Sequence, residues 1–231
     1  MLDGDMPGSF GGGGQDCTGA APGLERVLGQ AAEQLRKVPA GNMPEGLALV
    51  DFVLRAGCGD PDRAPFALLR ALGLTAVCSR SVRLPRPGGD RGRRPDDRVS
   101  LLAACGREEI GKAVSLVGGL DGQALGQAGL IEVARVMDPG EKLAPGIDRG
   151  AGRFEVQIQL VPGRRGRFPL KHFREWALAR GMEPQEGLGR DMGDGRIWSE
   201  PVRCPGGILD DLAGYAFVIG IREVTRINPV W

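Results

Sequence analysis

Aromatic side chains are scarce in this sequence, since Phe, Trp and Tyr make up 5% of its 231 residues. A folded core must therefore be built mainly from Leu, Val, Ile and Ala. There is one histidine, His172, which leaves a histidine-based metal site or catalytic relay without identifiable partners. The cysteines are odd in number, widely spaced and without a CxxC motif, which favours neither a disulfide framework nor a zinc site. They are Cys17, Cys58, Cys78, Cys105 and Cys204. We expect no cofactor and no metal.

The sequence also has no excess of charge of either sign. Thirty Lys and Arg residues against 29 Asp and Glu residues give a net charge of +1, so no chain-wide attraction to nucleic acid or to an anionic membrane is expected. No apolar run approaches the length of a membrane span, and residues 1–14 lack the basic and apolar regions of a signal peptide. Arg greatly outnumbers Lys, as in GC-rich genomes. These features predict a bacterial cytoplasmic protein.

Glycine and proline are abundant, with 39 and 17 residues, and they divide the chain. Residues 1–22 contain a four-glycine run and few apolar anchors, which predicts a disordered tail. Residues 138–152 are rich in turn-forming residues and predict a linker. The tail and the linker leave two segments that are predicted to fold, residues 23–137 and residues 153–231. Together they predict an α+β protein of two domains.

The first unit is predicted to be a helical bundle with a β-hairpin. Apolar residues between Leu24 and Val38 recur on one helical face, and two further helices are predicted in the next forty residues. Alternating apolar residues then predict two strands joined by a long loop. The expected elements are helices over 24–38, 44–56, 61–72 and 107–117 and strands over 76–84 and 99–105, with residues 121–137 compatible with either a helix or a strand. Three helices followed by a hairpin is also the order of a winged helix-turn-helix.

The second unit begins with a clear strand signal. Phe154, Val156, Ile158 and Leu160 alternate with polar residues, which is typical of a strand with one buried and one wet face. A helix after Pro169, two extended segments over 183–188 and 196–204, a short helix near residue 206 and a last strand within 217–227 follow. The order β-α-β-β-α-β predicts a ferredoxin-like fold.

The loop between the two predicted strands of the first unit is rich in arginine and is the candidate nucleic-acid-binding segment. In a winged helix-turn-helix such a loop contacts phosphates. Three aspartates within the loop offset much of this charge, and the third predicted helix has few polar groups with which to read bases. The competing interpretation is a solvated loop. The residues concerned are Arg86, Arg91, Arg93, Arg94 and Arg98.

A glycine-rich turn between residues 187 and 196 is the candidate anion-binding site. Glycine amides flanked by arginines can form an anion nest, although the segment matches neither GxGxxG nor the Walker pattern. The residues concerned are Gly187, Gly189, Arg190 and Arg196. Asp191 and Asp194 could bind a hard cation, but two carboxylates are few for such a site. A simple hairpin turn is the alternative.

Residues 154–227 resemble the βαββαβ propeptide of subtilisin-type serine proteases. The resemblance is carried by the opening strand Phe154-Glu155-Val156-Gln157-Ile158 and by the ending that runs from Leu209-Asp210-Asp211-Leu212 through Ile227. It implies a module that contacts a protease domain through its sheet face and inserts its C-terminal tail into the active site. Because no protease domain follows in this sequence, the expected role is in trans, as an inhibitor or assembly partner.

Three hypotheses for function remain. The leading one is a non-enzymatic protein-interaction or regulatory module that binds a protein partner or a second copy of itself. The second is a nucleic-acid-binding regulator that uses the Arg86–Arg98 loop, with Arg164, Arg165 and Arg167 as further candidates. The third is an enzyme with an unrecognised site near Asp191, Asp194 and His172, which requires these side chains to converge.

Overall fold

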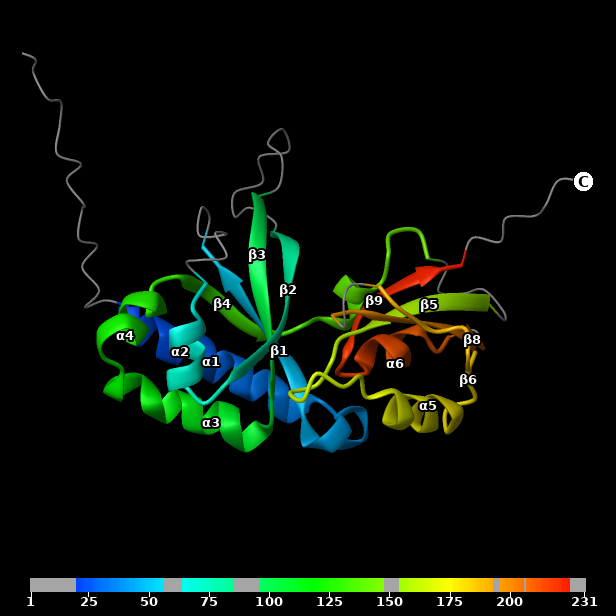
Figure 1. Cartoon of the computed structure of the whole chain (residues 1–231), viewed down its shortest axis with the longest axis horizontal. Helices are drawn as coiled ribbons and strands as arrows, with labels where there is room; N and C mark the ends of the chain where they lie inside the picture. Colours follow the sequence, from blue (N-terminus) through cyan, green and yellow to red (C-terminus); the bar gives the residue numbers. More distant parts are fainter. Residues whose placement is uncertain are drawn as a thin grey trace, which may run out of the picture.

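The computed structural model describes residues 20–55, 64–84, 96–147, 154–192, 196–205 and 207–224. Two antiparallel sheets lie side by side, one formed by residues before 137 and one by residues after 153 (Figure 1). Helices pack against both sheets, with α3 and α5 along the lower side of the view. The prediction of an α+β protein is confirmed.

The first sheet has four strands in the order β2-β3-β1-β4, each antiparallel to its neighbours. Helix α1 packs against β4 and α3, and α2 packs against α4. The strands are β1 (Ala48–Leu54), β2 (Thr75–Leu84), β3 (Asp96–Cys105) and β4 (Ile131–Val136), and the helices are α1 (Ala20–Lys37), α2 (Phe66–Ala71), α3 (Arg107–Leu116) and α4 (Gly122–Ala128).

The predicted helix over 44–56 is wrong. Only Pro44–Gly46 form a single 3-10 turn, and the residues from Ala48 to Leu54 form the central strand β1. Every residue of β1 is buried, so both of its faces carry apolar side chains and the alternation that marks a half-buried strand is lost. The first unit is therefore a sheet covered by helices, and a three-helix bundle does not form.

Other predictions for the first unit agree with the structure. The hairpin of β2 and β3 is present, with Leu84 opposite Asp96. The ambiguous segment 121–137 contains a helix and a strand in succession, α4 and β4. Gly73 ends α2 as predicted, with a φ of +70° that suits glycine. The predicted start of α2 near residue 61 lies outside the described residues.

The second sheet has the order β6-β8-β5-β9, and β7 also pairs with β8. Helices α5 and α6 lie on the same side of this sheet in Figure 1. The elements are β5 (Phe154–Leu160), α5 (Leu170–Leu178), β6 (Glu183–Pro184), β7 (Arg190–Asp191), β8 (Trp198–Cys204), α6 (Leu209–Gly214) and β9 (Val218–Glu223).

The two sheets share one strand order. When the two-residue strand β7 is set aside, each sheet has its second, third, first and fourth strands along the chain next to one another. In each sheet, helical segments lie between the first and second of these strands and between the third and fourth. Strand β1 corresponds to β5 in this scheme, and β4 corresponds to β9. The sequence-based expectation of two unlike units is therefore wrong, because the misassigned strand β1 is the one that completes the pattern.

A single buried apolar cluster runs through both sheets. Asn42, from the turn before β1, joins them: its Oδ1 accepts from Trp176 Nε1 at 2.9 Å, its Nδ2 donates to the Gly214 carbonyl at 3.2 Å, and its own carbonyl accepts from the Ala216 amide at 3.0 Å. Part of the predicted linker also has a fixed place, since the Ala144 amide donates to the Ile221 carbonyl along the outer edge of β9.

Candidate functional site

The helix-free face of the second sheet is the broadest candidate surface. Along the central strand β5, Val156, Ile158 and Leu160 are completely buried toward the helices, whereas Glu155, Gln157 and Gln159 point to the other face and are half-buried. The strand register brings Arg222 of β9 opposite Gln157 and Arg203 of β8 opposite Glu155. This helix-free face is therefore flat and polar and carries charges of both signs.

Close packing orders part of this face. Gln159 lies over Gly220 of the neighbouring strand, where an added Cβ would come within 2.6 Å of the Gln159 Oε1 atom. Arg203 Nε lies 3.8 Å from Glu155 Oε2. The close approach of Gln159 to Gly220 restricts the Gln159 side chain, whereas the Arg203 side chain is 54% exposed.

The corresponding face of the first sheet is built around a buried carboxylate. Asp51, at the middle of β1, is completely buried and accepts from Arg80 Nη2 at 2.8 Å and from the Ser100 hydroxyl. Arg135 Nη2 lies 3.8 Å from the same carboxylate and also forms a two-pronged ion pair with Glu141 at 2.7 and 2.8 Å. Burial raises the pKa of Asp51, although Arg80 and Arg135 act in the opposite direction.

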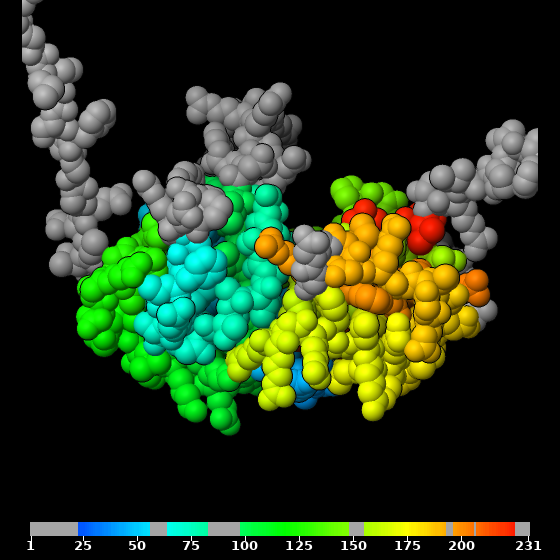
Figure 2. Space-filling view, in the orientation of Figure 1, coloured from blue at the N-terminus to red at the C-terminus, as the bar shows by residue number. Residues whose placement is uncertain are grey.

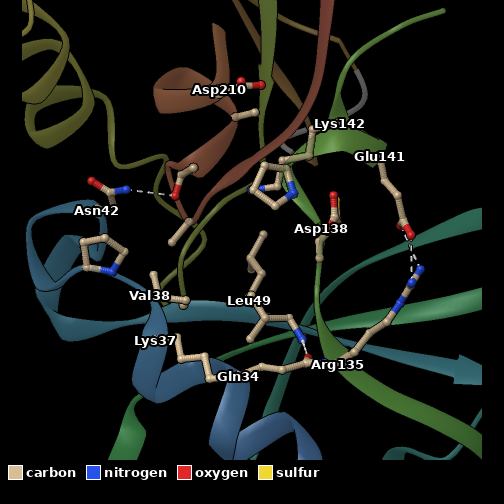
Figure 3. A pocket seen from close by; sticks show the side chains of 18 of the residues that line it. Gln34, Lys37, Val38, Asn42, Leu49, Arg135, Asp138, Glu141, Lys142 and Asp210 are labelled. Atoms are coloured by element: carbon tan, nitrogen blue, oxygen red, sulfur yellow. Dashed lines mark hydrogen bonds and ion pairs between the residues drawn. The ribbon is translucent and has the colours of Figure 1, made fainter. Parts of the chain in front are cut away.

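A cavity of about 600 Å³ lies where the two sheets meet (Figure 3). In Figure 3, Gln34, Lys37 and Val38 of the first unit lie across the cavity from Lys142 and Asp210. Lys142 is 5% exposed, and its Nζ donates to the Tyr215 carbonyl at 3.0 Å. Burial, with the positive charge of Arg80 as a smaller cause, lowers the pKa of Lys142 from 10.5 to about 7.

A second hollow, of about 660 Å³, contains the arginine-rich turn of the second unit. Arg164, Arg165, Arg167 and His172 all line it. Arg164 is already engaged: it forms a two-pronged ion pair with Glu109, and its Nε donates to the Ala104 carbonyl at 2.8 Å. In Figure 2 the yellow surface of this turn lies directly against the green surface of α3. The turn therefore helps to hold the two sheets together.

His172 does not converge with the predicted acidic residues. Its Nδ1 lies 3.0 Å from the hydroxyl of Tyr215, a buried tyrosine whose pKa is raised by desolvation. Asp191 lies in the short strand β7 and is absent from the lining of this hollow, and Asp194 lies outside the described residues. Within the described ranges, no three His, Cys, Asp or Glu side chains are grouped in a way that could hold a metal ion.

Most of the predicted nucleic-acid-binding loop lies outside the described residues, including Arg86, Arg91, Arg93 and Arg94. Arg98 is described and forms an ion pair with Glu132 of β4. The one member of the predicted set that can be placed is therefore part of the sheet and is paired with a carboxylate of the same protein.

The predicted anion-binding turn has a close packing role. Gly187 has a φ of +83°, and an added Cβ at Gly189 would overlap the Glu200 carboxylate and lie 2.7 Å from the Trp198 indole. Glu200 is buried and accepts from Arg174 Nε at 2.8 Å and from Trp198 Nε1 at 2.7 Å. Arg190 lies in β7, and Arg196 is exposed. Anion binding at this turn stays a prediction.

Sequence reasoning missed Asp51, Lys142 and Asn42. A signal existed for Asp51, because it is the one charged residue within the apolar run of β1 and a buried charge needs partners. No such signal existed for Lys142 or Asn42, which stand in turn-rich segments where polar residues are ordinary.

No protein-family model, no curated protein and no solved structure matches this chain. In the part of the chain that the structure describes, no helix is both long and apolar enough to cross a membrane. The assignment of function therefore rests on the surfaces and cavities described above.

Proposed function

We propose that this chain is a non-enzymatic protein-interaction module, and that the helix-free face of its second sheet is the surface that contacts the partner. The observation that carries the proposal is the half-buried row Glu155, Gln157 and Gln159 on the central strand, which no helix covers. A sheet face that no helix covers leaves room for a second layer to pack against it. The strand order β6-β8-β5-β9 supports the predicted ferredoxin-like fold of this unit.

The partner that we propose is a subtilisin-type protease domain, which this protein would contact in trans. The resemblance of residues 154–227 to protease propeptides implies contact through this same face. The face carries both Glu155 and Arg222, so it can complement a partner surface of mixed charge. Among the described residues, no large exposed apolar side chain lies on β5, β8 or β9, which is typical of a reversible interface.

The nucleic-acid alternative has less support. Arg98 is paired with Glu132, and Arg164 is paired with Glu109, so two of the basic residues on which that hypothesis drew already have partners. The net charge of +1 gives no general attraction to phosphate.

The test uses purified subtilisin as the probe. We expect the protein to form a complex by size-exclusion chromatography with light scattering, and to slow hydrolysis of a chromogenic peptide. A double variant, Gln157→Arg with Arg222→Glu, should weaken inhibition at least tenfold, because both changes lie at the centre of the face. Glu25→Arg, on the exposed side of α1, is the matched control and should leave inhibition unchanged.

Two results would overturn the proposal. One is the absence of any complex at micromolar concentrations, together with unchanged hydrolysis. The other is equal inhibition by the double variant and the control variant, which would move the contact to another surface. A deletion of residues 225–231 adds a separate readout: the resemblance implies loss of inhibition with retention of the complex.

A further inference from the structure

The cavity between the two sheets has an unusual lysine in its wall. Lys142 lies in the short turn that connects β4 to the second unit, and its side chain is 95% removed from solvent. An ammonium group has three hydrogen-bond donors, and within the described part of the chain Lys142 Nζ has one acceptor, the Tyr215 carbonyl. Among the described residues no carboxylate lies within ion-pair distance of this nitrogen.

The charges around Lys142 disfavour its protonated form. Arg80 is close enough to act on it repulsively, and Asp138 only partly offsets this effect. Arg135, the other cation near this end of the cavity, is committed to Glu141 and Asp51. With a pKa lowered to about 7, a substantial fraction of this buried amine is uncharged at neutral pH, and an uncharged amine is a nucleophile.

The cavity is suited to an uncharged molecule with an apolar body. Its walls include apolar side chains from both units, among them Leu49, Met137 and Ala213. Its ionisable lining residues are Lys37, Arg135 and Lys142 against Asp138, Glu141, Asp210 and Asp211. The lining has no excess of positive charge, and Arg135 is already paired with Glu141, so the cavity does not favour an anionic ligand. The volume of about 600 Å³ is that of a small-molecule site.

We propose that this cavity binds small uncharged aldehydes with an apolar body, and that Lys142 captures them as an imine. The lone pair of Nζ adds to the carbonyl carbon, and the carbinolamine that forms loses one water molecule to give the C=N bond. No oxidant, reductant or metal takes part. Imine formation consumes the amine that contacts the Tyr215 carbonyl, so ligand capture acts on the segment that joins the two sheets.

The site can be tested on the whole wild-type protein, because the sequence contains four lysines: Lys37, Lys112, Lys142 and Lys171. The protein is incubated at pH 7 with benzaldehyde and cyanoborohydride, which reduces an imine to a stable amine, and each lysine is then quantified by mass spectrometry. A lysine with the ordinary pKa of about 10.4 is uncharged in roughly one molecule in 2,500 at pH 7. We expect Lys142 to carry at least ten times more label than each of the other three.

Competition separates binding in the cavity from simple reactivity. Benzyl alcohol has the shape of the probe and no charge, so it should reduce labelling of Lys142 at least threefold, whereas benzoate at the same concentration should not. Equal labelling of all four lysines, or labelling of Lys142 that benzyl alcohol does not reduce, would overturn the proposal. The labelling measurement uses only the wild-type protein, so misfolding of a substituted variant cannot affect the result.

Discussion

The two sheets follow one strand order, but their helix-free faces differ in chemistry. At the middle of the central strand, the first sheet has Asp51 and the second has Gln157. Each faces an arginine on the neighbouring edge strand, Arg135 or Arg222, in register. In the first sheet this position is completely buried, and in the second it is half-buried. One topology thus supports a closed charge network and an open polar surface.

The difference teaches that the role of a face depends on what lies over it. A charge at a buried position must be paired or it destabilises the fold, so Asp51 is surrounded by Arg80, Arg135 and Ser100. At the solvated position an amide side chain needs no fixed partner, which leaves Gln157 available to another molecule. The same strand pattern therefore carries a closed charge network in one sheet and a half-buried polar row in the other.

The outer edges of the sheets differ as well. The edge of β9 is closed by Leu143 and Ala144 of the connecting segment. The ten-residue edge strand β2 has backbone hydrogen-bond partners on the β3 side only, among the described residues. Long open edges favour pairing with other chains, so β2 is the place where the first sheet is most exposed to self-association.

The largest expected effect comes from removing the buried charge of the first sheet. We expect Asp51→Ala to lower the free energy of unfolding by about 3–5 kcal/mol, because the change breaks a buried ion pair and leaves the half-buried Arg80 without its carboxylate partner. The Nε atoms of Arg80 and Arg135 are already buried without hydrogen-bond partners. Urea denaturation measures the change.

The matched control is Gln157→Ala, at the corresponding position of the second sheet, where we expect a change of about 0.5 kcal/mol or less. Similar losses for the two variants would break the comparison between a closed and an open face.

A smaller effect should come from pH through Lys142. Its pKa falls from 10.5 when unfolded to about 7 when folded, so above pH 7 the unfolded chain holds a proton that the folded chain has lost. This contribution to stability is complete above pH 10.5 and is lost as the pH falls to 7. Between pH 7 and 9, wild-type stability should rise by about 1 kcal/mol per pH unit relative to Lys142→Met. Parallel stability curves for the two proteins would contradict the assignment.

The smallest of these effects concerns the contact between the sheets. Asn42→Ala removes the acceptor of Trp176 Nε1 and the donor to Gly214. We expect a loss of about 1–2 kcal/mol, the cost of leaving a buried indole N–H unsatisfied. The loss of stability can be measured by thermal unfolding, with tryptophan fluorescence as the signal. Asn42→Asp restores the acceptor for Trp176 and should recover part of the loss; an equal loss in both variants would point to a purely steric role.

Local patterns in the sequence were sufficient for many elements. Three features could be predicted directly from the sequence: the alternation along β5, the apolar stripe of α1 and the hairpin of β2 and β3. Each of these elements has one solvent-exposed face and one buried face, which produces a regular pattern. The α+β class followed from these elements. Where both faces are dry, as in β1, the periodicity vanishes, and a buried strand cannot be told from a buried helix segment.

By itself, the sequence determined where the chain alternates, turns and breaks, since those properties reside in neighbouring residues. Only the tertiary structure decided which polar residues meet. Asp51, Arg80 and Arg135 come from three strands, and Lys142 reaches the carbonyl of Tyr215, far along the chain. Such contacts depend on strand order and on the packing of one sheet against the other. Burial, which depends on the whole fold, then raises the pKa of Asp51 and lowers the pKa of Lys142.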